Sequence, residues 1–330
     1  MAPSLYPLTF SPAFKDYAWG GENLARVLSR PVPAGRVAES WEVSAHPNGP
    51  TPISNGAWAG RSLQALFEEL GADLVGRRND YALELGRFPL LIKFLDANEW
   101  LSVQVHPRDR DLPDGFGKTE MWVVLDARPG AEIVLGLSER VGPEELRAAA
   151  RNGGLEALLH RLPARTGDVF FVPAGTVHAI GPGLVIAEIQ QSSDTTYRLY
   201  DWDRQGATAA ERPLHLEEAL SVLDYDAVRP RAAVPTLAGG TETLAGCRYF
   251  QTDRVELSES SALAGSCTGQ TLELWCLLEG DLSFEYGPEA ESIAAPTHAW
   301  VLLPAALGDY AATTRSGACL LRVTTPPAAA

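Results

Sequence analysis

The sequence predicts a mainly β protein that contains two similar β-barrels and a few short helices. Most of its 330 residues fall into short alternating segments separated by Gly, Pro and Asn, which is typical of antiparallel sandwiches and barrels. Helical periodicity is confined to a few stretches. The late segments "LELWCLLEGDLSFEYG" and "HAWVLLPAALGDYAA" resemble in layout the earlier "MWVVLDARPGAEIVLG" and "TGDVFFVPAGTVHAI", which indicates two copies of one barrel. Within the earlier copy, "ARPG" is typical of a hairpin turn.

Helices are expected in three places. The stretch "SLQALFEEL" places its apolar residues on one face behind Ser62 as N-cap, which predicts a helical insertion at about 60–76. A second insertion, at about 141–162, begins near Pro143 and breaks at a Gly-Gly pair, so we expect two short helices there. A further helix is expected over 215–223.

Domain limits follow from a change in composition after residue 228. The stretch "RPRAAVPTLAGG" is rich in Pro, Ala and Gly and has no periodicity, which predicts a linker over 229–240. The chain then divides into a first domain over 1–228 and a second over 241–330. The second copy has "LPAALGDYA" where the first has "VPAGTVHAI", and so lacks its histidine. We therefore expect a degenerate second barrel without metal ligands.

Charge and composition exclude several kinds of partner. The formal net charge is -15, and both nucleic acid and anionic membranes need a positive surface on the protein. No apolar run approaches the ~20 residues that span a bilayer, and the first residues lack the features of a signal peptide. The four cysteines form no CxxC pair. We expect a cytoplasmic protein without disulfides, in which an anionic substrate needs a local basic pocket.

Lysine is rare in this chain. The 27 basic residues include only three lysines, Lys15, Lys93 and Lys118. A compact ammonium does what a planar guanidinium cannot, so a surviving lysine is a functional candidate. Lys118 lies beside other polar residues in an expected strand and is a candidate for this reason, whereas Lys15 is expected to be an exposed residue.

A candidate metal site begins in "WLSVQVHPRD". Strand alternation gives this stretch an apolar face of Leu101, Val103 and Val105 and a polar face of Ser102, Gln104 and His106. If the apolar face packs against a second layer, the polar face looks into a cavity or into water.

Two further segments complete the candidate metal site. In "GKTEMWVVL", Lys118 and Glu120 fall on one face, and in "VPAGTVHAIG" a Pro-Ala-Gly turn leads His178 to a barrel mouth. His106, Glu120 and His178 form a two-histidine, one-carboxylate set, to which Gln104 can add an amide oxygen. This set suits Zn²⁺ and also Fe(II). The other histidines have no such partners.

The polar run "EIQQSSDTTYRLYDWDR" follows the last of these residues. It is too polar for a core strand and too rich in donors for a simple loop. Arg198 is its permanently charged donor, able to hold a phosphate or to stabilise an oxyanion. It is a candidate substrate contact.

Four stretches together closely resemble the type I mannose-6-phosphate isomerases, zinc enzymes of the cupin superfamily, in their shorter bacterial form. They are "ESWEVSAHPNG", "LIKFLDANEWLSVQVHPRD", "GKTEMWVVLDARPGAEI" and "VPAGTVHAIGPGLVIAEIQQSSDTTYRLYDWDR". The resemblance is dense between residues 36 and 204 and thin after 228. It implies two cupin-type jelly-roll barrels and a sugar-phosphate substrate.

The resemblance also implies roles for single residues. The family's ligands to one zinc ion fall on Gln104, His106, Glu120 and His178. Its catalytic arginine falls on Arg198, its active-site lysine on Lys118, and a site-lining acid on Glu188. The chain lacks the large helical insertion of longer relatives, so phosphate contacts made by that domain do not carry over.

The implied reaction interconverts D-mannose 6-phosphate and D-fructose 6-phosphate through an enediolate, with the metal polarising the sugar oxygens. The base stays open between Glu188, a water on the metal and a group beside a ligand. Two alternatives are an Fe(II) cupin oxygenase and a non-catalytic sugar-binding or regulatory cupin, since fold alone does not decide function. Gln104 and the run around Arg198 weigh against the oxygenase, which needs open metal positions and no phosphate clamp.

Overall fold

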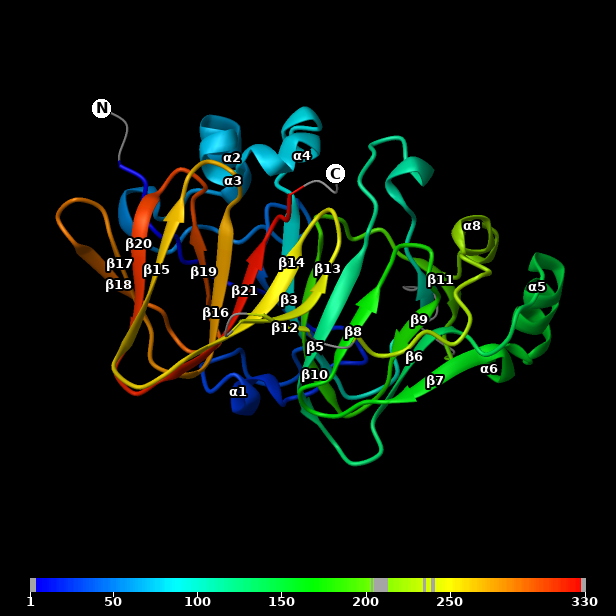
Figure 1. The fold of residues 1–330 in the computed structure, drawn as a ribbon. Coiled ribbons are helices and arrows are strands. Elements are labelled where there is room, and N and C mark those ends of the chain that lie inside the picture. Colours follow the sequence, from blue (N-terminus) through cyan, green and yellow to red (C-terminus); the bar gives the residue numbers. More distant parts are fainter. Residues whose placement is uncertain (1–3, 203, 205–212, 234–235, 239–240, 328–330) are drawn as a thin grey trace.

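Four antiparallel sheets, two in each half of the chain, make up the computed structural model of this protein. It describes residues 4–202, 204, 213–233, 236–238 and 241–327. The first half, cyan to green, forms the barrel on the right of Figure 1, and the second half, yellow to red, forms the barrel on the left. The predicted fold class, mainly β with two barrels, is confirmed.

The first barrel consists of a six-stranded and a five-stranded sheet. In spatial order, the six-stranded sheet is β1 (Ala13–Lys15), β2 (Glu39–Val43), β3 (Leu90–Ala97), β10 (Leu184–Gln191), β5 (Glu120–Ala127) and β8 (Val169–Val172). The five-stranded sheet is β11 (Tyr197–Tyr200), β4 (Val103–Val105), β9 (His178–Ile180), β6 (Glu132–Leu137) and β7 (Leu159–Pro163). One hydrophobic cluster lies between them, with Leu95 and Ile186 from the first sheet and Ile133 and Ile180 from the second.

The second barrel repeats this plan with a six-stranded and a four-stranded sheet. The six-stranded sheet is β12 (Thr236–Ala238), β13 (Thr241–Gly246), β14 (Gln251–Leu257), β21 (Ala318–Thr324), β16 (Glu273–Gly280) and β19 (Trp300–Leu303). The four-stranded sheet is β15 (Ser261–Cys267), β20 (Gly308–Thr314), β17 (Ser283–Tyr286) and β18 (Glu291–Ala294). The order β15-β20-β17-β18 corresponds to β4-β9-β6-β7 of the first barrel. The repeat expected from the layout of the sequence is therefore present in the topology.

The helices are short and lie outside the sheets. They are α1 (Leu24–Val27), α2 (Leu63–Leu70), α3 (Ala72–Val75), α4 (Asp80–Glu84), α5 (Pro143–Asn152), α6 (Leu155–Leu158) and α8 (Leu216–Val222), with 3-10 turns η1 (Gly56–Trp58), η2 (Arg77–Asn79) and η3 (Asp109–Asp111). All three predicted helical regions are confirmed, and the Ser62 hydroxyl accepts a hydrogen bond from the backbone N–H of Ala65, 3.2 Å away. Within the described part of the chain, every helix is too short or too polar to cross a bilayer.

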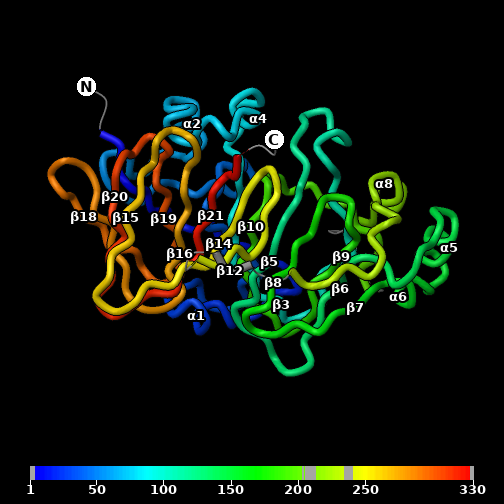
Figure 2. The backbone as a smooth tube through the Cα atoms, in the orientation of Figure 1, coloured from blue at the N-terminus to red at the C-terminus, as the bar shows by residue number. Residues whose placement is uncertain are grey.

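The largest hydrophobic cluster joins the two barrels. It contains Ile92 and Met121 from the first six-stranded sheet and Leu274 and Leu321 from the second. These two sheets lie side by side in the middle of the molecule, as Figure 2 shows for β10 and β21. Every residue of β3 and β10 is buried, since one face of each strand looks into the barrel and the other toward the second barrel.

The "ARPG" stretch does not form the hairpin that its residues indicate. β5 and β6, which flank it, belong to different sheets. β5 already pairs with β10 on one edge and β8 on the other, so it has no free edge for β6. The turn, closed by a 3.0 Å hydrogen bond from the Ala131 N–H to the Arg128 carbonyl, carries the chain from one sheet to the other.

The segment expected as a linker, 229–240, is partly a strand. Its residues Thr236–Ala238 form β12, which pairs with β13, and residues 234–235 and 239–240 lie outside the described part of the chain. No sheet in the described residues contains strands from both sides of this segment. We therefore retain the division into domains over 1–228 and 241–330 as a proposal.

The shared cluster predicts that the two barrels unfold together. Leu274→Ala, at a fully buried position of the second barrel within this cluster, should lower the free energy of unfolding by about 2–5 kcal/mol. Circular dichroism and tryptophan fluorescence in a denaturant titration should report one transition, shifted as a whole. Leu85→Ala, at a largely exposed position, should change stability by less than about 0.5 kcal/mol. Two separate transitions would contradict the shared core.

Candidate metal centre

The five-stranded sheet brings three predicted residues into one row. Gln104 on β4 is opposed by Arg198 on β11 and by His178 on β9. Opposed residues of neighbouring antiparallel strands project from the same face, so these three side chains share the face that looks into the barrel. The two valines of β4 point the other way, into the cluster that packs under α8.

Strand alternation was correct for Gln104 and wrong for Leu101. β4 begins only at Val103, so the period-two pattern does not extend back to Leu101. Leu101 belongs instead to the hydrophobic cluster inside the barrel. Ser102, also before the strand, is buried and donates its hydroxyl hydrogen to Gln104 Oε1 at 3.2 Å.

The six-stranded sheet contributes the facing wall. Trp41, Lys93, Glu188 and Trp122 oppose one another in register across β2, β3, β10 and β5, so their side chains project from one face of the sheet. Glu120 lies two residues before Trp122 and therefore shares its face. The predicted residues Glu120 and Glu188 are thus in the same barrel interior as the row on β4.

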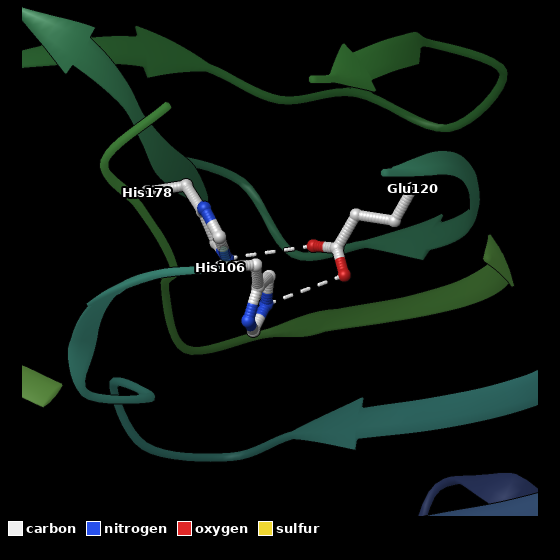
Figure 3. A group of neighbouring side chains, drawn as sticks. All are labelled: His106, Glu120 and His178. Carbon is white, nitrogen blue, oxygen red and sulfur yellow. Dashed lines mark ion pairs between the residues drawn. The ribbon is translucent and has the colours of Figure 1, made fainter. Parts of the chain in front are cut away.

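His106, Glu120 and His178 converge. His106 Nε2 lies 3.4 Å from Glu120 Oε2, and His178 Nε2 lies 3.4 Å from Glu120 Oε1, as the dashed lines of Figure 3 mark. Such separations are close to those between ligands of a tetrahedral ion bound at about 2.0–2.2 Å. Among the described residues, this is the group of three that combines the spacing and the ligand types of a metal site, and all three are buried.

The ring orientation of both histidines is fixed by the backbone. His106 Nδ1 lies 2.8 Å from the carbonyl oxygen of Thr195, and His178 Nδ1 lies 2.8 Å from that of Thr176. A carbonyl only accepts, so each Nδ1 carries the hydrogen and each Nε2 presents its lone pair toward Glu120. Burial lowers the pKa of His178 to about 4, and burial with the charge of Lys118 holds the pKa of His106 well below its usual value. Both rings are therefore neutral at pH 7.

The donor set fits a cation. Both oxygens of Glu120 are buried and two imidazole lone pairs face them, and within the described chain only the ammonium of Lys118 offers them a hydrogen. The ammonium of Lys118 contacts this set from the cavity side: Nζ is 3.0 Å from His106 Nε2 and 2.8 Å from Glu120 Oε2. The same lone pairs that hold this positive charge are those that zinc or iron requires.

Gln104 lies at the edge of this set. Its Nε2 is 3.3 Å from His178 Nε2, and it lies across from His178 in the sheet. A half-turn of the amide exchanges the nitrogen for Oε1 and presents an oxygen to the same point. The geometry thus allows a fourth oxygen ligand, as the sequence predicted.

A buried charge network surrounds the centre. Lys93 Nζ lies 3.3 Å from Glu39 Oε2 and 3.4 Å from Glu188 Oε2, and it stacks over the ring of Trp41. Burial alone would lower the pKa of Lys93, but Glu39 and Glu188 raise it above its usual value. Burial alone would raise the pKa of Glu188, but the positive charges of Lys118 and Lys93 outweigh this effect and hold the pKa of Glu188 below its usual value. Both groups are charged at pH 7.

Arg198 remains without such a partner. Its Nε is buried and has no hydrogen-bond partner among the described residues. Burial lowers the pKa of Arg198, which the charge of Asp201 partly opposes, and the guanidinium stays protonated at pH 7. A cation whose buried Nε has no hydrogen-bond partner among the described residues thus lies one strand away from Gln104.

A cavity of about 770 Å³ connects these groups to the outside. Lys118, Gln104, Glu188 and Arg198 all line it, whereas His106, Glu120 and His178 lie behind the first two of these. Its size is in the range of small-molecule sites. The cavity therefore exposes a carboxylate, Glu188, and a guanidinium, Arg198, next to the candidate metal centre.

Three lining residues were not singled out from the sequence as part of a site. Lys93 and Glu39 belong to fully buried strands without polar alternation, but a lone lysine in the apolar run "LLIKFLDA" is itself a signal. Asp194, also in the lining, receives hydrogen bonds from His46 and Asn48, and the one from His46 contributes most to holding its pKa below the usual value. His46 is thus a turn residue near the site.

Comparison with known proteins identifies the family. Residues 8–121 match the family model described as phosphomannose isomerase type I, catalytic domain. The mannose-6-phosphate isomerase ManA of Bacillus subtilis is 38% identical over 313 residues, which cover 92% of this chain and 95% of that protein. The mannose-6-phosphate isomerase of Streptococcus mutans is 40% identical over 261 residues, covering 77% and 80% of the two chains.

Solved structures agree with these matches. The crystal structure of the mannose 6-phosphate isomerase from Bacillus subtilis superimposes with a TM-score of 0.83 at 30% identity, covering 96% of this chain and 99% of that one. A mutant phosphomannose isomerase from Salmonella typhimurium shares the fold with a TM-score of 0.78 at 16% identity. The fold and the site define an isomerase-like protein of two β-barrels, with a His, Glu, His group in the first barrel. The chain belongs to the type I mannose-6-phosphate isomerase family.

The geometry of the centre predicts the effect of removing one donor. His178→Ala should weaken binding of a divalent metal by at least about tenfold, because the centre loses a fixed nitrogen ligand. Metal content after gel filtration, measured by mass spectrometry, checks this. His298→Ala is the matched control, since His298 also bonds a backbone carbonyl through Nδ1 but lies in the second barrel. Equal metal content in both variants would exclude His178 as a ligand.

Proposed function

We propose that this protein is a zinc-dependent aldose-ketose isomerase that interconverts D-mannose 6-phosphate and D-fructose 6-phosphate. The observation that carries the proposal is the row Arg198, Gln104, His178, which puts a guanidinium that lines the cavity beside a two-histidine, one-carboxylate centre. Family membership over nearly the whole chain supports it. Location in the cytoplasm stays a prediction.

One Zn²⁺ would be held by His106, Glu120 and His178, with Gln104 as fourth ligand. The two imidazoles are neutral and oriented, and the carboxylate is held by the ammonium of Lys118, so a bound ion would take over the contacts that this ammonium makes with His106 and Glu120. When bound, zinc supplies Lewis acidity that polarises the sugar oxygens on C1 and C2.

The proton transfer falls to the residues that line the cavity. The reaction removes the proton on C2 of the aldose, forms a C1=C2 enediolate, moves the hydroxyl proton from O2 to O1, and returns a proton to C1 to give the ketose. We assign Glu188 to this transfer because it lines the cavity and is held ionised by Lys118 and Lys93. Trp122 Nε1 donates to Glu188 Oε1 at 3.2 Å and fixes its direction.

Two cations face the negative charge of the substrate. Lys118 contacts the metal centre and lines the cavity, so it can meet the charge that develops on the sugar oxygens. Arg198 lines the cavity one strand from Gln104, and its guanidinium suits either that charge or the phosphate. Within an acidic chain, these residues supply the local basic pocket that the composition required.

The proposed reaction makes a direct test possible. In an assay coupled to fructose 6-phosphate formation, the purified protein should turn over mannose 6-phosphate, lose activity with a chelator and recover it with Zn²⁺. An oxygen electrode should record no uptake. Binding of the sugar without turnover would favour a non-catalytic sugar-binding cupin, and oxygen consumption restored by Fe(II) would favour an oxygenase.

Arg198→Ala should lower kcat by about 10²- to 10³-fold, because it removes a preorganised cation from a water-poor site. Metal content should stay close to that of the wild type, since the guanidinium is not a ligand. Arg110→Ala serves as control, because its side chain is 78% exposed. Unchanged turnover in the Arg198 variant would remove this residue from the mechanism.

A further inference from the structure

A second carboxylate, Asp109, accepts hydrogen bonds from three separate parts of the chain. It opens η3, three residues after His106. Its Oδ1 accepts from the Gly117 N–H and from Gln191 Nε2, both at 2.9 Å, and its Oδ2 accepts from Arg248 and from the Tyr249 hydroxyl. Burial would raise the pKa of Asp109, but these hydrogen bonds hold it below its usual value, so the group is ionised.

The two bonds to Oδ1 hold the segment that leads to Glu120. Gly117 precedes Lys118, and a Cβ placed on it would lie 2.6 Å from the Asp109 nitrogen, so the two backbones are in direct contact. The next N–H, that of Lys118, donates to the Pro107 carbonyl at 3.1 Å. The His106 and Glu120 segments are therefore fastened to each other at this point.

Gln191 extends the same fastening to the end of β10. Its Nε2 donates to Asp109, and its Oε1 accepts from the N–H of Thr119 at 2.9 Å. Thr119 lies between Lys118 and Glu120. The Gln191 amide therefore connects Asp109 to the backbone just before Glu120, the first residue of β5.

The two bonds to Oδ2 come from the second barrel. Arg248 and Tyr249 form the tip of the hairpin between β13 and β14, which a 2.8 Å bond from the Cys247 N–H to the Phe250 carbonyl closes. The ring of Tyr249 packs on Tyr81 at 5.5 Å, and Arg248 stacks over the Tyr249 ring. This hairpin is thus held rigidly against the first barrel.

We propose that Asp109 is a positioning residue through which this hairpin of the second barrel keeps His106 and Glu120 in metal-binding geometry. A barrel without a metal-ligand cluster in its described residues thereby contributes to the retention of the metal. This inference rests on the proposed metal role of the two residues. Hydrogen-bonded partners outside the ligand set typically change metal affinity or activity by about 10- to 100-fold.

Metal release from the zinc-loaded protein tests the proposal. With a colorimetric chelator in excess, Asp109→Asn should release zinc about tenfold faster than wild type, because an amide nitrogen meets the donors of Arg248 or Gly117. Tyr249→Phe, which keeps the ring and removes only the hydroxyl, should release it about threefold faster. The controls are Asp281→Asn, which loses bonds to Ser316 and Arg315, and Tyr310→Phe, which loses a 2.8 Å bond to Glu273. Both controls should match wild type.

The outcomes separate this inference from the proposed function. If wild type holds zinc and both variants release it at the wild-type rate, the inference is wrong and the proposed function stands. If wild type binds no zinc, the proposed function fails first. If Asp109→Asn does not fold, Tyr249→Phe against Tyr310→Phe still decides. A purely structural role would lower the unfolding midpoint of Tyr249→Phe and Tyr310→Phe alike, without faster release in either, and this result would also contradict the inference.

Discussion

The buried carboxylate of Glu120 is the constraint on which the rest of the first barrel depends. A carboxylate with so few hydrogen-bond donors is costly in a protein interior, and burial raises the pKa of Glu120 to about 7 although the charge of Lys118 opposes this. Here the nearest groups to its two oxygens include imidazole nitrogens that present lone pairs rather than hydrogens. Only positive charge makes such an arrangement favourable. Strands β4 and β9 and the bonds to backbone carbonyls hold the two imidazole rings with their lone pairs toward one point. The ammonium of Lys118 contacts the ring of His106 and the carboxylate there.

The charges around the cavity follow a second rule, that each buried cation except one is matched by carboxylates. Lys93 lies between Glu39 and Glu188, and Lys118 lies against Glu120. Arg198 lacks a hydrogen-bond partner at its buried Nε among the described residues. A chain with a net charge of -15 can therefore still present a guanidinium to an anion in this cavity. The ion pairs among the residues around the cavity, more than the net charge of the chain, decide which ligands the cavity attracts.

Much of the site could be predicted because strand alternation is a local rule. It placed Gln104, His106, Glu120 and His178 toward one interior, and the structure brings them together. The rule failed where the strand had not yet begun, at Leu101.

The features that could not be predicted depend on which strands are neighbours. Lys93 was not assigned to the site because both faces of β3 are buried, so its sequence shows no alternation to read. The "ARPG" turn was misread because a turn signal does not say whether the strands it joins have free edges. For the same reason, the contact between Asp109 and the tip of a hairpin some 140 residues later has no signature in the sequence.

The hydrophobic cluster that the two barrels share has a thermodynamic consequence for ligand binding. When two halves share a core, a ligand that binds one of them stabilises both by mass action. An ion at 100 times its dissociation constant would add about 2.7 kcal/mol to the stability of the whole chain, including the barrel that never touches it.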